Sequence, residues 1–179
     1  MLRSNKMVVI IDYGMGNVAS VQKTLKFLDI KSEVTNDPKK ISDSDCIILP
    51  GVGSFKQGMT NLHDLGLVEV LNEEVIKKKK KFLGICLGMQ LIASKGTEPE
   101  PTDGLGWIDG EVIRFDFKDR RIPHLGWNNI EVKNSKYLDD VEDMNFYFIH
   151  SYHFKVKNQN QISSYVNYGE KIVSSVTHE

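Results

Sequence analysis

The sequence predicts an α/β fold, with a mostly parallel central sheet flanked by helices and additional antiparallel strands in the second half. In the first half, short β-branched runs alternate with longer stretches of helical periodicity. After about residue 103, short strand-like runs follow one another with little helix between them. A length of 179 residues with 40% hydrophobic content fits a single domain over residues 1–179.

The first-half elements are expected to alternate as in a parallel sheet with crossover helices. The expected strands are residues 7–11, 31–35, 46–49 and 82–85, and the expected helices are 18–28, 67–76 and one that starts at about residue 87. The third strand should end before PGVGSF (50–55), because proline and glycine rarely continue a strand. The lysine run 77–81 is interpreted as a solvated helix end that complements the helix dipole, not as a nucleic-acid site.

The second half should form another, more antiparallel layer packed on the first. Its expected strands are 111–115, 130–132, 147–149, 164–168 and 172–176.

Charge and cysteine content exclude several classes of protein. Lys plus Arg (23) nearly balances Asp plus Glu (24), so no strong field attracts nucleic acid or a membrane surface. No apolar run approaches the ~18 residues of a membrane span, and the N-terminus lacks the pattern of a signal peptide. The expected location is therefore the cytoplasm. Cys46 and Cys86 show no metal-binding spacing, so free thiols and no metal site are predicted.

Cys86 is the candidate nucleophile. In GICLG an apolar strand ends at Ile85, Cys86 takes the turn and a helix starts at Leu87, as in the nucleophile elbows of α/β enzymes. A thiol at a helix N-terminus is expected to favour the thiolate. The alternative, a buried structural cysteine, is assigned to Cys46.

A thiolate that attacks a carbonyl needs hydrogen-bond donors for the oxyanion. One donor would be the backbone N–H of Leu87, the residue after the nucleophile. Another would come from PGVG, whose residues Gly51, Val52 and Gly53 follow the neighbouring strand and should reach the same sheet edge. Taken alone, this loop could also be only a tight glycine turn.

Six motifs resemble the class I (triad) glutamine amidotransferases, and more narrowly the HisH family, the glutaminase subunits of imidazole glycerol phosphate synthase. They are IIDYGMGN (10–17), LPGVGSF (49–55), LGICLGMQL (83–91), GLGW (104–107), PHLGWN (123–128) and FIHSY (148–152). GICLGMQ alone indicates the class; DYGMGN, PHLGWN and HSY narrow it to this subunit.

The resemblance implies hydrolysis of L-glutamine to glutamate and ammonia without a cofactor. It also implies a heterodimer with a cyclase subunit, a HisF-like (β/α)8 barrel that uses the ammonia in histidine biosynthesis. Cys86 would form the glutamyl thioester. The implied contacts to the amino-acid head of the substrate are Gln90, Glu98 and the backbone of Ser151 and Tyr152.

The resemblance also implies a partner-facing side. Its residues would be Met15, Asn17, Ser20, Trp127 and Tyr147. For Trp127 a place in the core stays an alternative. His124 and His150 match no catalytic histidine of the family and are interpreted as polar support for the wall of the active site.

One family motif has no counterpart. The family places its general base in a late QFHPEKS-like motif, whereas this sequence ends in SSVTHE, where His178 and Glu179 imitate the motif only superficially. The expectation is a domain shown without its C-terminal segment, with His178 as a displaced base as the alternative. Two other functions stay open: a glutaminase that feeds another synthase, such as one that aminates a surface sugar, and a non-catalytic interaction subunit.

Overall fold

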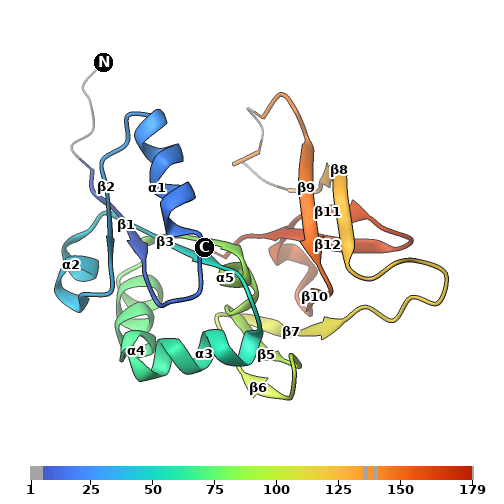
Figure 1. Ribbon diagram of the computed structural model, residues 1–179, viewed down its shortest axis with the longest axis horizontal. Coiled ribbons are helices and arrows are strands. Elements are labelled where there is room, and N and C mark those ends of the chain that lie inside the picture. Colours follow the sequence, from blue (N-terminus) through green and yellow to red (C-terminus); the bar gives the residue numbers. More distant parts are fainter. Residues whose placement is uncertain (1–5, 135–136, 139–140, 179) are drawn as a thin grey trace.

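The computed structural model describes residues 6–134, 137–138 and 141–178. A parallel sheet in the order β2-β1-β3-β4 forms the first half (Figure 1). Its strands are β1 (Val8–Ile11), β2 (Ser32–Thr35), β3 (Cys46–Gly51) and β4 (Lys81–Cys86). The register aligns Gly51 with Cys86, so both predicted catalytic turns leave the same edge of the sheet.

Helices connect these strands and cover the sheet. They are α1 (Val18–Phe27), α2 (Pro38–Asp43), α3 (Phe55–Asp64) and α4 (Leu67–Leu71), and α4 continues into a wider π-helical turn, η1 (Asn72–Lys77). Asn17 caps α1 by accepting a hydrogen bond from the backbone of Ser20, and Ser54 caps α3 in the same way at Gln57. After β4, the helix α5 (Leu87–Gln90) is a single turn.

Two further sheets form the second half, on the right of Figure 1. One has the order β10-β7-β5-β6 and contains β5 (Ala93–Gly96), β6 (Thr102–Asp103), β7 (Ile108–Arg114) and β10 (Tyr152–Val156). The other has the order β12-β11-β8-β9 and contains β8 (His124–Val132), β9 (Asn145–His150), β11 (Ile162–Asn167) and β12 (Lys171–Val176), with the short helix η2 (Gln159–Gln161) before β11. The predicted fold class, a parallel sheet with added antiparallel strands, is confirmed.

A continuous apolar core joins the first half to the second. Phe55 and Leu87 from the catalytic side and Phe154 from β10 belong to the same buried cluster. The elbow after β4 is therefore held by packing on both sides, which fixes the position of Cys86.

One local prediction is wrong and another is incomplete. The strand β3 does not stop at Leu49, because its pairing with β4 continues through Pro50 and Gly51. The lysine run is not only a solvated helix end: Lys78 and Lys80 both pair with the buried Glu74 carboxylate, at 2.8 and 2.9 Å. Lys80 also donates to the carbonyls of Ile41 and Ser42, and so ties α2 to the start of β4.

Candidate active site

Cys86 lies at a strained elbow between β4 and α5. Its backbone has φ 55° and ψ −113°, a region that a residue with a side chain occupies only under constraint from its surroundings. The flanking glycines permit the approach: a Cβ on Gly88 would lie 1.8 Å from the carbonyl oxygen of Leu49, and one on Gly84 would lie 2.6 Å from that of Gly88. The predicted sharp turn is therefore present.

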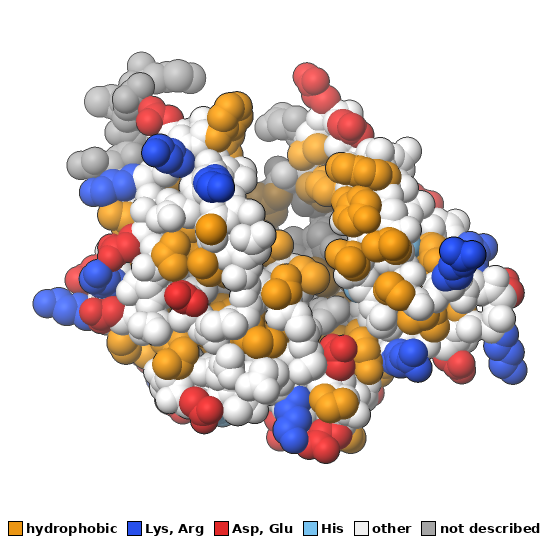
Figure 2. Space-filling view, in the orientation of Figure 1, with side chains coloured by type: hydrophobic (Ala, Val, Ile, Leu, Met, Phe, Trp, Pro, Cys, Tyr) orange, Lys and Arg blue, Asp and Glu red, His pale blue; other side chains and the backbone are white. Residues whose placement is uncertain are grey.

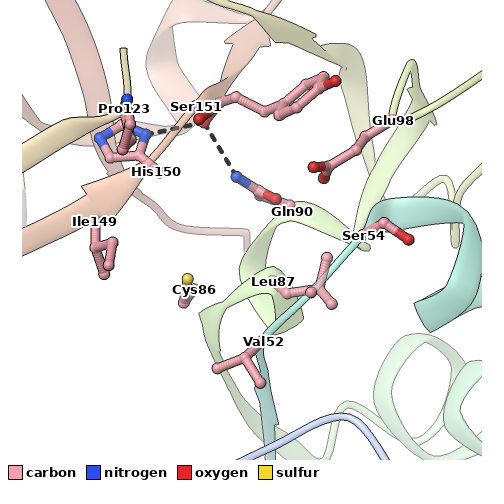
Figure 3. Close-up of a pocket in the computed structure, with 12 residues that line it drawn as sticks. Val52, Ser54, Cys86, Leu87, Gln90, Glu98, Pro123, Ile149, His150 and Ser151 are labelled. Atoms are coloured by element: carbon pink, nitrogen blue, oxygen red, sulfur yellow. Dashed lines mark hydrogen bonds between the residues drawn. The ribbon is translucent and has the colours of Figure 1, made fainter. Parts of the chain in front are cut away.

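A pocket with a volume of about 440 Å³ opens above this elbow (Figure 3). Eight of the predicted site residues line it: Val52, Gly53, Cys86, Leu87, Gln90, Glu98, Ser151 and Tyr152. Gly51 is buried beneath it, where an added Cβ would lie 2.4 Å from the hydroxyl of Tyr13. Residues from the first and the second half thus meet around one thiol.

Four other residues line the same pocket: Ser54, Pro123, Ile149 and His150. His150 was expected to support the wall, but the other three were not predicted as part of the site. They are neighbours of predicted motifs, since Pro123 opens PHLGWN and Ile149 lies within FIHSY.

The expected activation of the thiol by the helix is not observed. Burial raises the pKa of Cys86, the nearby Glu98 carboxylate raises it further, and the backbone N–H of Leu87 only partly offsets them. The physical reason is burial, because a thiolate removed from water loses more hydration free energy than one backbone hydrogen bond returns. Burial also raises the pKa of Glu98 itself, while the backbone N–H of Phe55 lowers it.

The two expected oxyanion donors differ in orientation. The backbone N–H of Leu87 lies close enough to the Cys86 thiol to lower its pKa. The backbone N–H of Val52 instead donates to the carbonyl of Met15, at 3.0 Å. In this structure the Val52 donor is turned away from the pocket.

Two side chains of the pocket contact the same backbone carbonyl, and one of them, Gln90, is expected to bind the amino-acid head of the substrate. Gln90 donates its side-chain amide to the carbonyl oxygen of Tyr152 at 3.2 Å, and His150 contacts the same oxygen at 2.8 Å (Figure 3). Glu98 faces Gln90 from the opposite wall. Within the described residues, no three His, Cys, Asp or Glu side chains group closely enough to hold a metal ion.

The residues expected at a partner interface lie on the surface. Trp127 and Tyr147 are directly opposite each other in β8 and β9, with ring centroids 5.5 Å apart. The exposed fraction of Trp127 is 67%, so its alternative place in the core is wrong. With Leu125 and Ile149 they form an exposed apolar stripe over β8 and β9, where Figure 2 shows apolar side chains gathered.

The other partner-facing residues surround the start of α1. Asn17 and Ser20 are exposed, and Met15 is half-buried against the core. The side chain of Asn17 already accepts a hydrogen bond from the backbone of Ser20 at 3.1 Å, so it also has a structural role as a helix cap.

His178 lies away from the pocket. Its Nδ1 is 3.1 Å from the side-chain amide of Gln161, and it is not among the residues that line the pocket around Cys86. Glu179 lies outside the described residues. A second cavity of about 490 Å³ also reaches Cys86, along the exposed edge of β4, and the histidines that line it are His150 and His153.

Comparison with known proteins identifies the family. Residues 9–179 match the family model "Glutamine amidotransferase class-I". The chain is 40% identical to imidazole glycerol phosphate synthase subunit HisH 2 of Methanococcus maripaludis, over 97% of this chain and 87% of that protein. It is 42% identical to subunit HisH of Pelagibacter ubique, over 96% and 86%, and to the chloroplastic synthase hisHF of Arabidopsis thaliana, over 97% and 30%.

Solved structures share the fold at lower sequence identity. A crystal structure of a glutamine amidotransferase superposes with a TM-score of 0.67 at 17% identity, covering 94% of this chain and 89% of that one. PurLQS from Thermotoga maritima gives a TM-score of 0.65 at 14% identity, over 94% and 77%. No helix in the described part of the chain is long and apolar enough to cross a membrane. The chain belongs to the class I glutamine amidotransferases and, among them, to the HisH family.

Proposed function

We propose that this chain is the glutaminase subunit of an imidazole glycerol phosphate synthase. The observation that carries the proposal is the strained Cys86 elbow at the floor of a pocket whose walls are Gln90, Glu98 and the Ser151–Tyr152 backbone. The names of the curated relatives support the assignment to histidine biosynthesis, and we propose a cytoplasmic location for this chain.

The reaction is a nucleophilic acyl transfer. The sulfur of Cys86 attacks the side-chain carbonyl carbon of L-glutamine, and the negative charge that develops on oxygen is stabilised by the backbone N–H of Leu87. The protonated amide leaves as ammonia, and a thioester remains on Cys86. Water then cleaves the thioester, which yields glutamate and restores the thiol.

Full oxyanion stabilisation requires the Val52 N–H to turn toward Cys86. That N–H is bonded to the Met15 carbonyl, so the proposed resting state lacks one donor. Loss of one such donor lowers turnover by ~100-fold or more. We propose that a barrel-shaped cyclase subunit binds beside Met15 and the exposed stripe of β8 and β9, and that binding releases the donor.

The proposed partner has support in the names of the relatives. Two of the matched proteins are named as HisH subunits of the synthase. A third is named as the synthase hisHF, and the match covers 30% of that longer protein. The exposed Trp127 and Tyr147 are of the residue types that anchor protein interfaces.

Turnover also requires a general base beside the thiol. Of the described histidines, only His150 and His153 line a cavity that reaches Cys86, and the pKa of each is lowered by burial. We therefore propose that the 179 residues bind L-glutamine and become alkylated at Cys86, but do not turn over glutamine.

The test is release of ammonia from L-glutamine by the 179-residue chain, with and without the cyclase subunit, beside its His178→Ala variant. The expected result is covalent labelling of Cys86 by the chloroketone analogue of L-glutamine without turnover. In that reaction the thiolate displaces chloride and forms a thioether. Absence of saturable labelling would contradict the glutaminase assignment, and robust turnover lost on His178→Ala would make His178 the base.

A further inference from the structure

A pair of histidines lies behind the wall of the candidate pocket. His124 of β8 and His150 of β9 are directly opposite in the strand register, and Nδ1 of His124 lies 2.9 Å from Nε2 of His150. His124 is fully buried. Its ring is stacked between Phe148 and Tyr168, at centroid distances of 4.8 and 4.0 Å. Packing therefore fixes the plane of the ring and the direction of both nitrogens.

The pair belongs to a longer chain of polar contacts. At one end, Nε2 of His124 lies 2.8 Å from Oδ1 of Asn128. At the other end, Nδ1 of His150 lies 2.8 Å from the carbonyl oxygen of Tyr152. In β8 the side chains of His124 and Asn128 share the face opposite Trp127, so the contacts run along the inner face of β8 and β9 to the wall of the pocket.

The number of available protons determines which group donates in each of these hydrogen bonds. The three contacts need one proton each, but two neutral imidazole rings carry only two. Burial lowers the pKa of His150, the hydrogen bond to the Tyr152 carbonyl partly offsets this, and the neighbouring His124 lowers the pKa further, so a second proton on His150 is disfavoured. The missing proton then comes from the Asn128 amide, turned so that its nitrogen donates to His124. His124 Nδ1–H donates to His150, and His150 Nδ1–H donates to the Tyr152 carbonyl.

The end of the chain is the carbonyl that also holds Gln90. The Gln90 amide donates to the same Tyr152 oxygen at 3.2 Å, and both hydrogen bonds are visible in Figure 3. Ser151 and Tyr152 line the same pocket as Gln90 and Glu98. A fixed Tyr152 carbonyl therefore fixes both the backbone wall and the Gln90 side chain.

We propose that His124 and His150 are positioning residues for recognition of the amino-acid head of glutamine, and that they act through the Tyr152 carbonyl. This inference rests on the proposed glutaminase function. If the two histidines had only a structural role, ring stacking would be enough to hold them. Positioning of the Tyr152 carbonyl also requires a hydrogen-bond donor where Nδ1 of His150 lies. The two roles therefore separate in variants that keep the shape of the side chain but move the donor.

Asparagine and glutamine at position 150 provide that separation. The amide of asparagine occupies the place of Nδ1, whereas that of glutamine reaches the place of Nε2. Labelling of Cys86 by the chloroketone analogue of L-glutamine is measured by mass spectrometry on the 179-residue chain at increasing concentrations. We expect His150→Gln to raise the half-saturating concentration about tenfold, and His150→Asn to recover most of that loss.

Controls separate recognition from reactivity and folding. Alkylation by iodoacetamide, which has no amino-acid head, should proceed at the same rate in both variants, and the exposed His63→Gln should behave as wild type. Thermal denaturation reports folding. If His150→Gln does not fold, Asn128→Leu interrupts the chain at its other end and should raise the half-saturating concentration in the same direction.

Nitrogen NMR of the imidazole rings tests the mechanism directly. We expect both His124 and His150 to carry the proton on Nδ1 at neutral pH. A proton on Nε2 of His150 would overturn the inference, as would equal half-saturating concentrations for His150→Asn and His150→Gln in folded proteins. Wild-type protein without saturable labelling would instead contradict the proposed function, so the two failures are distinguishable.

Discussion

The backbone N–H of Val52 donates to the carbonyl of Met15, 3.0 Å away, and not toward the thiol of Cys86. Met15 comes from the turn between β1 and α1, which we propose to lie beside the cyclase subunit. Under this proposal, the hydrogen bond that withholds an oxyanion donor is made with a segment that the partner contacts.

Replacing Val52 tests this donor. Val52→Pro removes the N–H, whereas Val52→Ala keeps it, and the Val52 side chain is more than half exposed, so little packing is lost. With the cyclase subunit bound, we expect chloroketone labelling of Cys86 to be about tenfold slower in Val52→Pro than in Val52→Ala. Without the partner the two rates should agree, because the donor is already turned away. Equal rates in the complex would show that the Val52 N–H is not used.

The two cysteines should differ sharply. Cys86→Ala should abolish labelling by the chloroketone while leaving the thermal unfolding midpoint nearly unchanged, because Cys86 is exposed at the edge of the sheet. Cys46→Ala should retain labelling, since Cys46 is half-buried in β3 and does not line the pocket that holds Cys86. Labelling lost in Cys46→Ala but kept in Cys86→Ala would identify the wrong nucleophile.

Tyr13→Phe should stabilise the protein. Within the described residues, the hydroxyl of Tyr13 is the buried side-chain polar atom without a hydrogen-bond partner, and burial raises its pKa. Removing an unsatisfied buried hydroxyl should raise the free energy of unfolding by about 1 kcal/mol, measured by urea denaturation. Tyr168→Phe is the matched control with the opposite sign, because the Tyr168 hydroxyl donates to the carbonyl of Arg121 at 2.9 Å. A destabilised Tyr13→Phe would mean that this hydroxyl has a partner in solution.

His153 should make stability depend on pH below neutrality. Burial, followed by Lys155 and His150, lowers the pKa of His153 to about 4. An unfolded chain protonates this histidine at a pKa of about 6.5. Between these two values the unfolded state binds more protons, so the free energy of unfolding falls as pH falls from about 6.5 to about 4, by about 3 kcal/mol in total.

The check is urea denaturation at several pH values across that window. His153→Phe should stack on Phe115, as His153 does at 4.8 Å, and should show a flatter profile. The exposed His63→Gln should keep the slope of the wild type. An unchanged slope in His153→Phe would assign the pH dependence to another group.

Sequence patterns predicted most elements of the first half, because β1, β3 and β4 are rich in apolar residues and are bounded by turns. They missed α3 (Phe55–Asp64), in which Gly58 and several polar residues interrupt the apolar pattern. Gly58 packs closely there, since an added Cβ would lie 3.1 Å from the Leu91 side chain. They also missed α2, β5, β6 and β10; of these, α2 has six residues and β6 has two, which are too few for a periodic signal.

The sequence by itself determined the parallel sheet, the Cys86 elbow and the family motifs, since each depends on residues close together along the chain. Tertiary structure alone decided the state of the site. The fold places the Glu98 carboxylate near Cys86, where it raises the pKa of the thiol. It directs the Val52 N–H to the carbonyl of Met15. It also brings the side chains of His150 and Gln90 to the same Tyr152 carbonyl. Electrostatic and hydrogen-bond energies depend on distance and burial in three dimensions, which no local pattern encodes.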